Sequence, residues 1–117
     1  MRTEANKRLR TLNNLVSFSK PLDELSSDLS EFSWDYDGEP LVVTSSQIAE
    51  VLKRYTSGEI DSGEVEQWAN MLECREDIKF EESNKEQLEN IIYSLANPAL
   101  EGEINIDLCN QFLKDLP

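Results

Sequence analysis

Three capping motifs mark helix starts in this chain, and each is followed by apolar residues at helical spacing. Thr44-Ser45-Ser46-Gln47 has the form of a capping box, in which the first side chain accepts an orphan N–H and the fourth reaches back. Residues 61–64 and 83–86 repeat this form, which predicts helices packed around a shared core. The apolar faces of these three helices comprise Ile48, Val51, Leu52, Tyr55, Val65, Trp68, Ala69, Leu72, Leu88, Ile91, Ile92 and Leu95.

Apolar stripes predict further helices at both ends of the chain. The first helix spans about residues 4–17. A second helix has Pro21 in its first turn, and Asn105 caps the last one. The apolar faces of these helices comprise Leu9, Leu12, Leu15, Val16, Leu22, Leu25, Leu29, Phe32, Leu108, Cys109, Phe112 and Leu116.

The predicted fold is mainly α, a single domain over residues 1–117 with about six helices. Residues 44–73 are expected to form a helical hairpin, because Gly58 can end its first helix in the left-handed conformation. Near 34–43 the helical pattern breaks, and we expect either a short extended segment or a hairpin there. Alternating polar and apolar residues over 75–81 permit a second extended segment.

The net charge of −13 is unevenly distributed along the sequence. Residues 1–20 form a basic N-terminal helix in this prediction, with five basic side chains and one acid, which leaves about −17 on the remainder. Such a field repels nucleic acid and anionic membrane and speeds encounter with basic proteins. We therefore expect a basic protein as partner and no direct contact with nucleic acid or membrane. The alternative is that the charge only maintains solubility.

The basic residues near the N-terminus allow two interpretations. Arg8 and Arg10 could contact RNA phosphate, but the segment lacks the interleaved aromatic residues that stack on bases. A solvated helix face that pairs with the acidic body is the preferred interpretation.

The residues that most enzymes and metal sites need are missing. The chain has no histidine, so Ser-His-Asp and Cys-His arrangements are impossible, and no Walker-type loop or dinucleotide-binding glycine pattern is present. Cys74 and Cys109 are expected to be reduced, buried thiols, since no histidine completes a zinc site with them. Pro40 stands where an EF-hand begun at Asp35 would need its turn glycine. We expect no enzymatic activity, no cofactor and no bound metal.

One segment interleaves aromatic residues with acids, and it is the candidate recognition surface. Aromatic anchors can bury area while neighbouring carboxylates meet arginines. The alternative is that Trp34 and Tyr36 cover the edge of the core while the acids face solvent, whereas Trp68 is expected inside the core. The candidate partner-binding residues are Glu31, Trp34, Asp35, Tyr36, Asp37 and Glu39.

Four short stretches carry a resemblance to a known class of proteins. Residues 55–60, 68–70, 75–78 and 95–98 resemble segments of small helical immunity proteins of bacterial contact-dependent growth-inhibition and polymorphic toxin systems. The resemblance covers roughly residues 41–110 and is one of pattern. It implies a cytoplasmic antidote that binds the C-terminal domain of a cognate toxin, commonly a basic nuclease. The alternative is an acidic adaptor or regulatory subunit that binds a bacterial enzyme away from its active site.

Overall fold

The computed structural model describes residues 2–32, 39–73, 75 and 77–116, with the side chains of residues 2–6 outside the description. These ranges contain seven α-helices, one short 3-10 helix and two strands, so the predicted mainly α single domain is confirmed. The elements are α1 (Arg2–Ser17), α2 (Leu22–Leu29), β1 (Leu41–Val43), α3 (Ser45–Thr56), α4 (Ser62–Leu72), β2 (Ile78–Phe80), η1 (Glu82–Asn84), α5 (Lys85–Ala96), α6 (Pro98–Glu101) and α7 (Ile106–Asp115).

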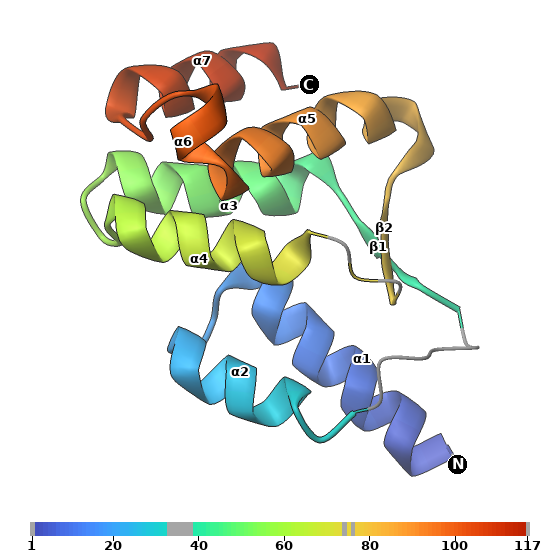
Figure 1. Cartoon of the computed structure of the whole chain (residues 1–117). Coiled ribbons are helices and arrows are strands. Elements are labelled where there is room, and N and C mark those ends of the chain that lie inside the picture. Colours follow the sequence, from blue (N-terminus) through green and yellow to red (C-terminus); the bar gives the residue numbers. More distant parts are fainter. Residues whose placement is uncertain (1, 33–38, 74, 76, 117) are drawn as a thin grey trace.

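The helices are stacked in three tiers (Figure 1). Helices α1 and α2 form one end of the molecule, α3 and α4 lie in the middle, and α5 to α7 form the other end. The most extensive helix packing is that of α4 on α5, followed by that of α3 on α7. The two helices of the expected hairpin over 44–73 therefore each pack most extensively on a helix that comes later in the chain. Both also contact α1, so they connect the N-terminal tier to the C-terminal one.

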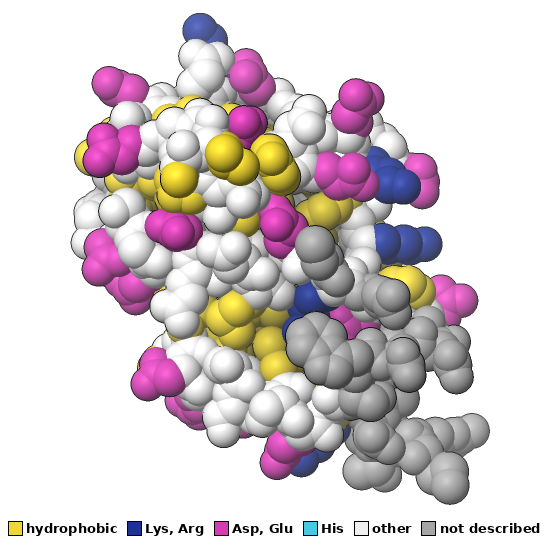
Figure 2. Space-filling model, viewed as in Figure 1, with side chains coloured by type: hydrophobic (Ala, Val, Ile, Leu, Met, Phe, Trp, Pro, Cys, Tyr) yellow, Lys and Arg dark blue, Asp and Glu magenta, His cyan; other side chains and the backbone are white. Residues whose placement is uncertain are grey.

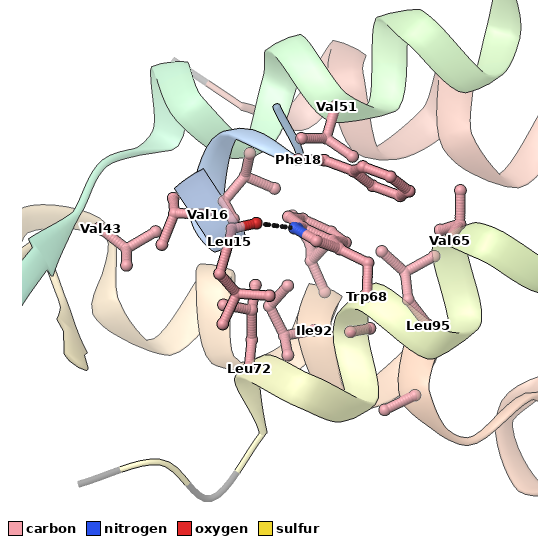
Figure 3. Close-up of a cluster of buried hydrophobic side chains, with 14 of the residues drawn as sticks. Leu15, Val16, Phe18, Val43, Val51, Val65, Trp68, Leu72, Ile92 and Leu95 are labelled. Atoms are coloured by element: carbon pink, nitrogen blue, oxygen red, sulfur yellow. Dashed lines mark hydrogen bonds between the residues drawn. The ribbon is translucent and has the colours of Figure 1, made fainter. Parts of the chain in front are cut away.

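Trp68 lies at the centre of the core, as the helical stripe on α4 predicts. Its side chain is fully buried, and its indole Nε1–H donates a 2.8 Å hydrogen bond to the backbone carbonyl of Leu15 near the end of α1. Figure 3 shows the ring among apolar side chains from several helices, with Phe18 and Val51 on one side and Leu95 nearby. The bond satisfies the polar atom of a buried ring and ties α1 to α4.

Two of the three predicted capping boxes are present. The Thr44 side chain accepts a hydrogen bond from the backbone of Gln47, whose side chain accepts from the Thr44 N–H in return, and Asp61 and Glu64 do the same before α4. Gly58 follows the end of α3 with a φ of +86°, the left-handed conformation predicted for it. The Asn105 side chain caps α7 by accepting from the Leu108 N–H.

The third predicted capping box, over 83–86, is wrong. These residues enter a 3-10 turn first, and α5 begins at Lys85 with no side-chain hydrogen bond from Asn84 to the helix. Asn84 instead donates to the Ser83 hydroxyl. A 3-10 turn supplies i to i+3 hydrogen bonds of its own, so the helix start does not depend on a side-chain cap.

The two extended segments pair with each other. Strands β1 and β2 form a parallel ladder in which Leu41, Val42 and Val43 face Ile78, Lys79 and Phe80. This confirms extended structure at 41–43 and within 75–81, but β1 pairs with β2 through a crossover containing α3 and α4. Glu81, directly after β2, accepts a hydrogen bond from the Ser45 N–H at the start of α3. This bond lowers the pKa of Glu81 below its usual value.

The link between α1 and α2 depends on Phe18, which has a positive φ of 52°. A bulky residue in this conformation is strained, and burial of the ring together with contacts from Arg54 hold it in place. The Arg54 guanidinium donates to the carbonyls of Ser17 and Phe18 at 3.1 and 2.7 Å. Pro21 then precedes α2 with an extended ψ of 144°, so it lies outside the first turn predicted for it.

The C-terminal tier differs from the prediction in two respects. Helix α6 was not expected, because a single turn carries no helical period that a sequence pattern can display. In α7, Cys109 is buried, whereas Leu108, Phe112 and the following Leu116 at the C-cap are only partly buried. Helix α7 packs on α3 at the outside of the stack, so its apolar face is covered less completely.

Candidate partner-binding surface

The ion pairs of the described side chains lie in the first two-thirds of the sequence. All seven ion pairs of the described side chains join residues between Lys7 and Asp77. The exposed pair Lys7–Glu31 joins α1 to the end of α2 at 3.0 Å, and Lys20 lies 3.7 Å from both Glu24 and Asp28 on α2. On this side of the molecule, most basic groups are already engaged by acids of the same chain.

A buried cluster of two arginines and one aspartate lies between α1 and β2. Arg75 donates two hydrogen bonds to the Asp77 carboxylate at 2.8 and 2.9 Å, and Arg8 lies 3.3 Å from the same carboxylate. The Arg8 guanidinium also lies 5.1 Å from the centre of the Phe32 ring. The side chains of Arg8 and Asp77 are 6% and 4% exposed. The expected pairing of the basic helix with the acidic body is confirmed, but Arg8 is buried rather than solvated.

The predicted recognition segment is described only at its two ends. Trp34, Asp35, Tyr36 and Asp37 lie outside the described residues. Glu31 and Glu39 are both exposed, and Glu31 is engaged by Lys7. The expectation that the aromatic and acidic side chains of this segment form one surface therefore stays a prediction.

The C-terminal tier differs from the rest of the molecule in that its acids have few basic residues near them in the sequence. No lysine or arginine occurs between Lys85 and Lys114, while the same stretch contains five carboxylates. All five are exposed, and within the described part of the chain none forms an ion pair. They are Glu86, Glu89, Glu101, Glu103 and Asp107. This acidic surface is available to an external cation.

Apolar side chains interrupt the acidic surface around α6. Leu100 and Ile106 are 75% and 51% exposed, and they lie on either side of the loop that joins α6 to α7. Figure 2 shows apolar side chains gathered over α6 and the adjoining end of α5, with carboxylates on several sides of them. We call residues 98–107 the α6 corner. It combines exposed apolar area with the exposed carboxylates of Glu101, Glu103 and Asp107.

The described residues do not assemble a recognisable reactive centre. Burial raises the pKa of the Cys109 thiol to about 11, so this group is protonated and unreactive at neutral pH. No group of three or more potential metal ligands occurs among the described residues. A cleft of about 570 Å³ between η1, α5 and α7 is lined by Glu82, Glu86 and Asp115, but these three acids are exposed to solvent.

Comparisons with known proteins give no further guide. No protein-family model matches the chain, and no curated protein or solved structure matches it significantly. The resemblance to immunity proteins therefore stays a prediction. None of the helices in the described ranges is long and apolar enough to cross a membrane.

Sequence reasoning did not single out the α6 corner, although one signal for it was present. The absence of lysine and arginine from 86–113 can be read from the sequence directly. The exposure of Leu100 and Ile106 cannot, because both residues would also suit the buried face of a helix. The charge pattern of the sequence therefore indicates an acidic surface on the C-terminal tier, but it does not locate the exposed apolar residues of the α6 corner.

Proposed function

We propose that this protein is a binding inhibitor of the immunity type, which neutralises a basic protein through the carboxylates of its C-terminal tier. The observation that carries the proposal is the division of charge between the two ends of the molecule. The ion pairs all lie within residues 7–77, whereas the five carboxylates of 86–113 are exposed without an ion-pair partner among the described residues. Unpaired surface carboxylates attract a basic partner and increase its rate of association.

The proposed partner is the C-terminal domain of a cognate toxin, and a nuclease fits best. A nuclease that binds phosphate presents lysines and arginines, and carboxylates can occupy the same positions on its surface. Blocking by contact requires no catalytic group in the inhibitor. The identification of the partner as a toxin depends on the resemblance of short segments, while its basic character is supported by the charge pattern.

Co-expression tests this proposal directly. The candidate partner is the product of the adjacent gene, expressed from a tightly regulated promoter with and without this protein. We expect the partner to arrest growth when expressed alone, and we expect co-expression to restore growth and yield a complex that survives size-exclusion chromatography. A complex with a partner that does not affect growth would favour the adaptor alternative.

A variant pair makes the co-expression test specific to the C-terminal tier. Neutralising Glu101, Glu103 and Asp107 together should weaken protection, because these carboxylates have no ion-pair partner among the described residues. Neutralising Glu24, Glu31 and Glu50 removes the same amount of charge from ion-paired positions and should leave protection intact. Equal protection by both variants would contradict the proposal that the C-terminal carboxylates carry the function.

A further inference from the structure

The α6 corner presents large apolar side chains to solvent on a short, well-defined piece of backbone. Among the described residues, only Val42, Tyr93, Leu100 and Ile106 are large hydrophobics with high exposure, and Leu100 is the most exposed of them. Single exposed apolar residues are common on protein surfaces. Leu100 and Ile106 flank one short loop, and Figure 2 shows apolar side chains gathered over α6. We call these two exposed side chains the apolar projection, since apolar area gathered in one place is a feature of interaction sites.

Local hydrogen bonds and one buried anchor fix the shape of the corner. The N–H groups of Leu100 and Glu101 donate to the Asn97 carbonyl at 3.0 and 2.9 Å, so α6 is held as a closed turn. Gly102 then turns the chain with a φ of +114°, a conformation that strongly favours glycine. Ile104, only 7% exposed, anchors the middle of the loop in the core. A projection that is already ordered loses little entropy when a partner binds.

The charges around the projection define the chemistry of its partner. Glu101, Glu103 and Asp107 are exposed beside Leu100 and Ile106 and have no ion-pair partner within the described part of the chain. No lysine or arginine of this chain lies in the surrounding stretch 86–113. A negatively charged or neutral surface would leave these acids repelled or desolvated without compensation. A basic surface would pair with them.

We propose that the α6 corner is the docking site, and that Leu100 and Ile106 enter an apolar socket bordered by lysines or arginines on a basic protein. This inference rests on the proposed function and specifies its binding site. The apolar contact at the centre of the interface governs dissociation, and the carboxylates at its border speed association. The segment 31–39 then lies outside the main interface.

Site-specific photo-crosslinking in cells of the source organism tests the location of the interface. A benzophenone amino acid replaces Leu100, Ile106 or, as the control, Val42, which is 43% exposed on β1 and follows the alternative segment 31–39 in the sequence. We expect positions 100 and 106 to crosslink to the same basic protein, identified by mass spectrometry, and position 42 not to crosslink to it. Crosslinking of that protein through position 42 alone would overturn the α6 corner as the docking site and leave the proposed function intact.

The identified partner is then purified for a quantitative test with matched variants. Leu100→Ser should speed dissociation of the complex about tenfold or more, the size expected for a central apolar contact, while Val42→Ser should change it less than about twofold. Both residues are exposed, so circular dichroism should show both variants folded. An unchanged dissociation rate for Leu100→Ser would overturn the docking site. If neither crosslinking nor affinity capture recovers a basic protein at all, the proposed function itself is contradicted.

Discussion

The two ends of this molecule use charge in different ways. At the N-terminal end, Arg8, Asp77 and Arg75 form a buried cluster, and surface pairs such as Lys7–Glu31 join neighbouring helices. At the C-terminal end, residues 78–116 contain eight carboxylates and three lysines, and no ion pair occurs among the described residues there. Part of the charge therefore joins elements of the structure at one end, whereas the carboxylates of the other end form no ion pair among the described residues.

The contrast shows why net charge alone does not locate a binding surface. A carboxylate that lies beside a cation of its own chain has part of its charge offset, so it attracts a new cation less strongly. An exposed carboxylate without such a neighbour attracts the cation with its full charge, screened by water and salt. Acids occur at about the same density in both parts of the sequence, with sixteen in residues 1–77 and eight in residues 78–116, whereas all ion pairs of the described side chains lie in the first part.

The largest expected effect tests the core that joins the two ends. Trp68→Ala should lower the free energy of unfolding by roughly 3–5 kcal/mol, because the ring is fully buried where α1 meets α4. Trp68→Phe keeps most of the volume and removes the hydrogen bond to the Leu15 carbonyl, so it should cost less, about 1–3 kcal/mol. Urea denaturation followed by circular dichroism measures both, and an unchanged midpoint for Trp68→Ala would place the ring outside the core.

The next effect separates structural from available carboxylates. Asp77→Ala should cost about 3 kcal/mol, because it leaves the buried Arg8 without its carboxylate and frees Arg75 from a bidentate pair. Glu103→Ala, the control, should change the stability by less than about 0.5 kcal/mol, since Glu103 is exposed and has no ion pair in the described part of the chain. Similar losses in chemical denaturation would show that the two ends do not differ in the way described.

A smaller effect concerns repulsion among the unpaired acids. Glu101→Gln, Glu103→Gln and Asp107→Asn combined should leave the stability unchanged or raise it by up to about 0.5 kcal/mol at low salt. The matched combination Glu24→Gln, Glu31→Gln and Glu50→Gln should lower it slightly, because each acid has a lysine partner. Thermal denaturation at low and high salt should show the difference shrinking as salt increases. A loss of stability in the first combination would reveal a structural role for the α6 corner.

The smallest effect is a pH dependence at the start of α3. The Ser45 N–H lowers the pKa of Glu81 below its usual value of 4.5, so the interaction stabilises the protein above that pH. The stabilisation is lost as the pH falls through the lowered pKa. Wild type should therefore be more stable than Glu81→Gln at neutral pH, and the two should converge in acid. A stability difference that does not depend on pH would show that the Glu81 charge is not responsible.

Local sequence signals predicted the helices and most of their ends correctly. The capping boxes at Thr44 and Asp61 depend on residues three positions apart, so the sequence displays them directly. The pairing of β1 with β2 and the burial of Arg8 against Asp77 join residues far apart in the chain, and no local pattern specifies such partners. Helix α6 is too short to show a period.

The candidate site was harder to predict than the fold. The interleaved aromatic and acidic residues of 31–39 form a pattern that the sequence displays directly. Only Glu31, Phe32 and Glu39 of that segment are described by the structure. The α6 corner has an ordinary composition, and its distinction lies in exposure and in the absence of partners. Both are properties of the folded chain.

The central claim is that the carboxylates of the C-terminal tier, and not the ion-paired ones, attract a basic partner. It is tested most directly by the association rate constant of the purified complex, measured by stopped-flow at several salt concentrations for wild type and the two triple variants. The variants carry the same net charge. The account predicts that Glu101→Gln/Glu103→Gln/Asp107→Asn associates several-fold more slowly than wild type at low salt. Its association rate constant should also depend less on salt, changing by about one logarithmic unit at most over the series. Both quantities should stay close to wild type for Glu24→Gln/Glu31→Gln/Glu50→Gln. Equal slowing of both variants, or greater slowing of the ion-paired set, would contradict it.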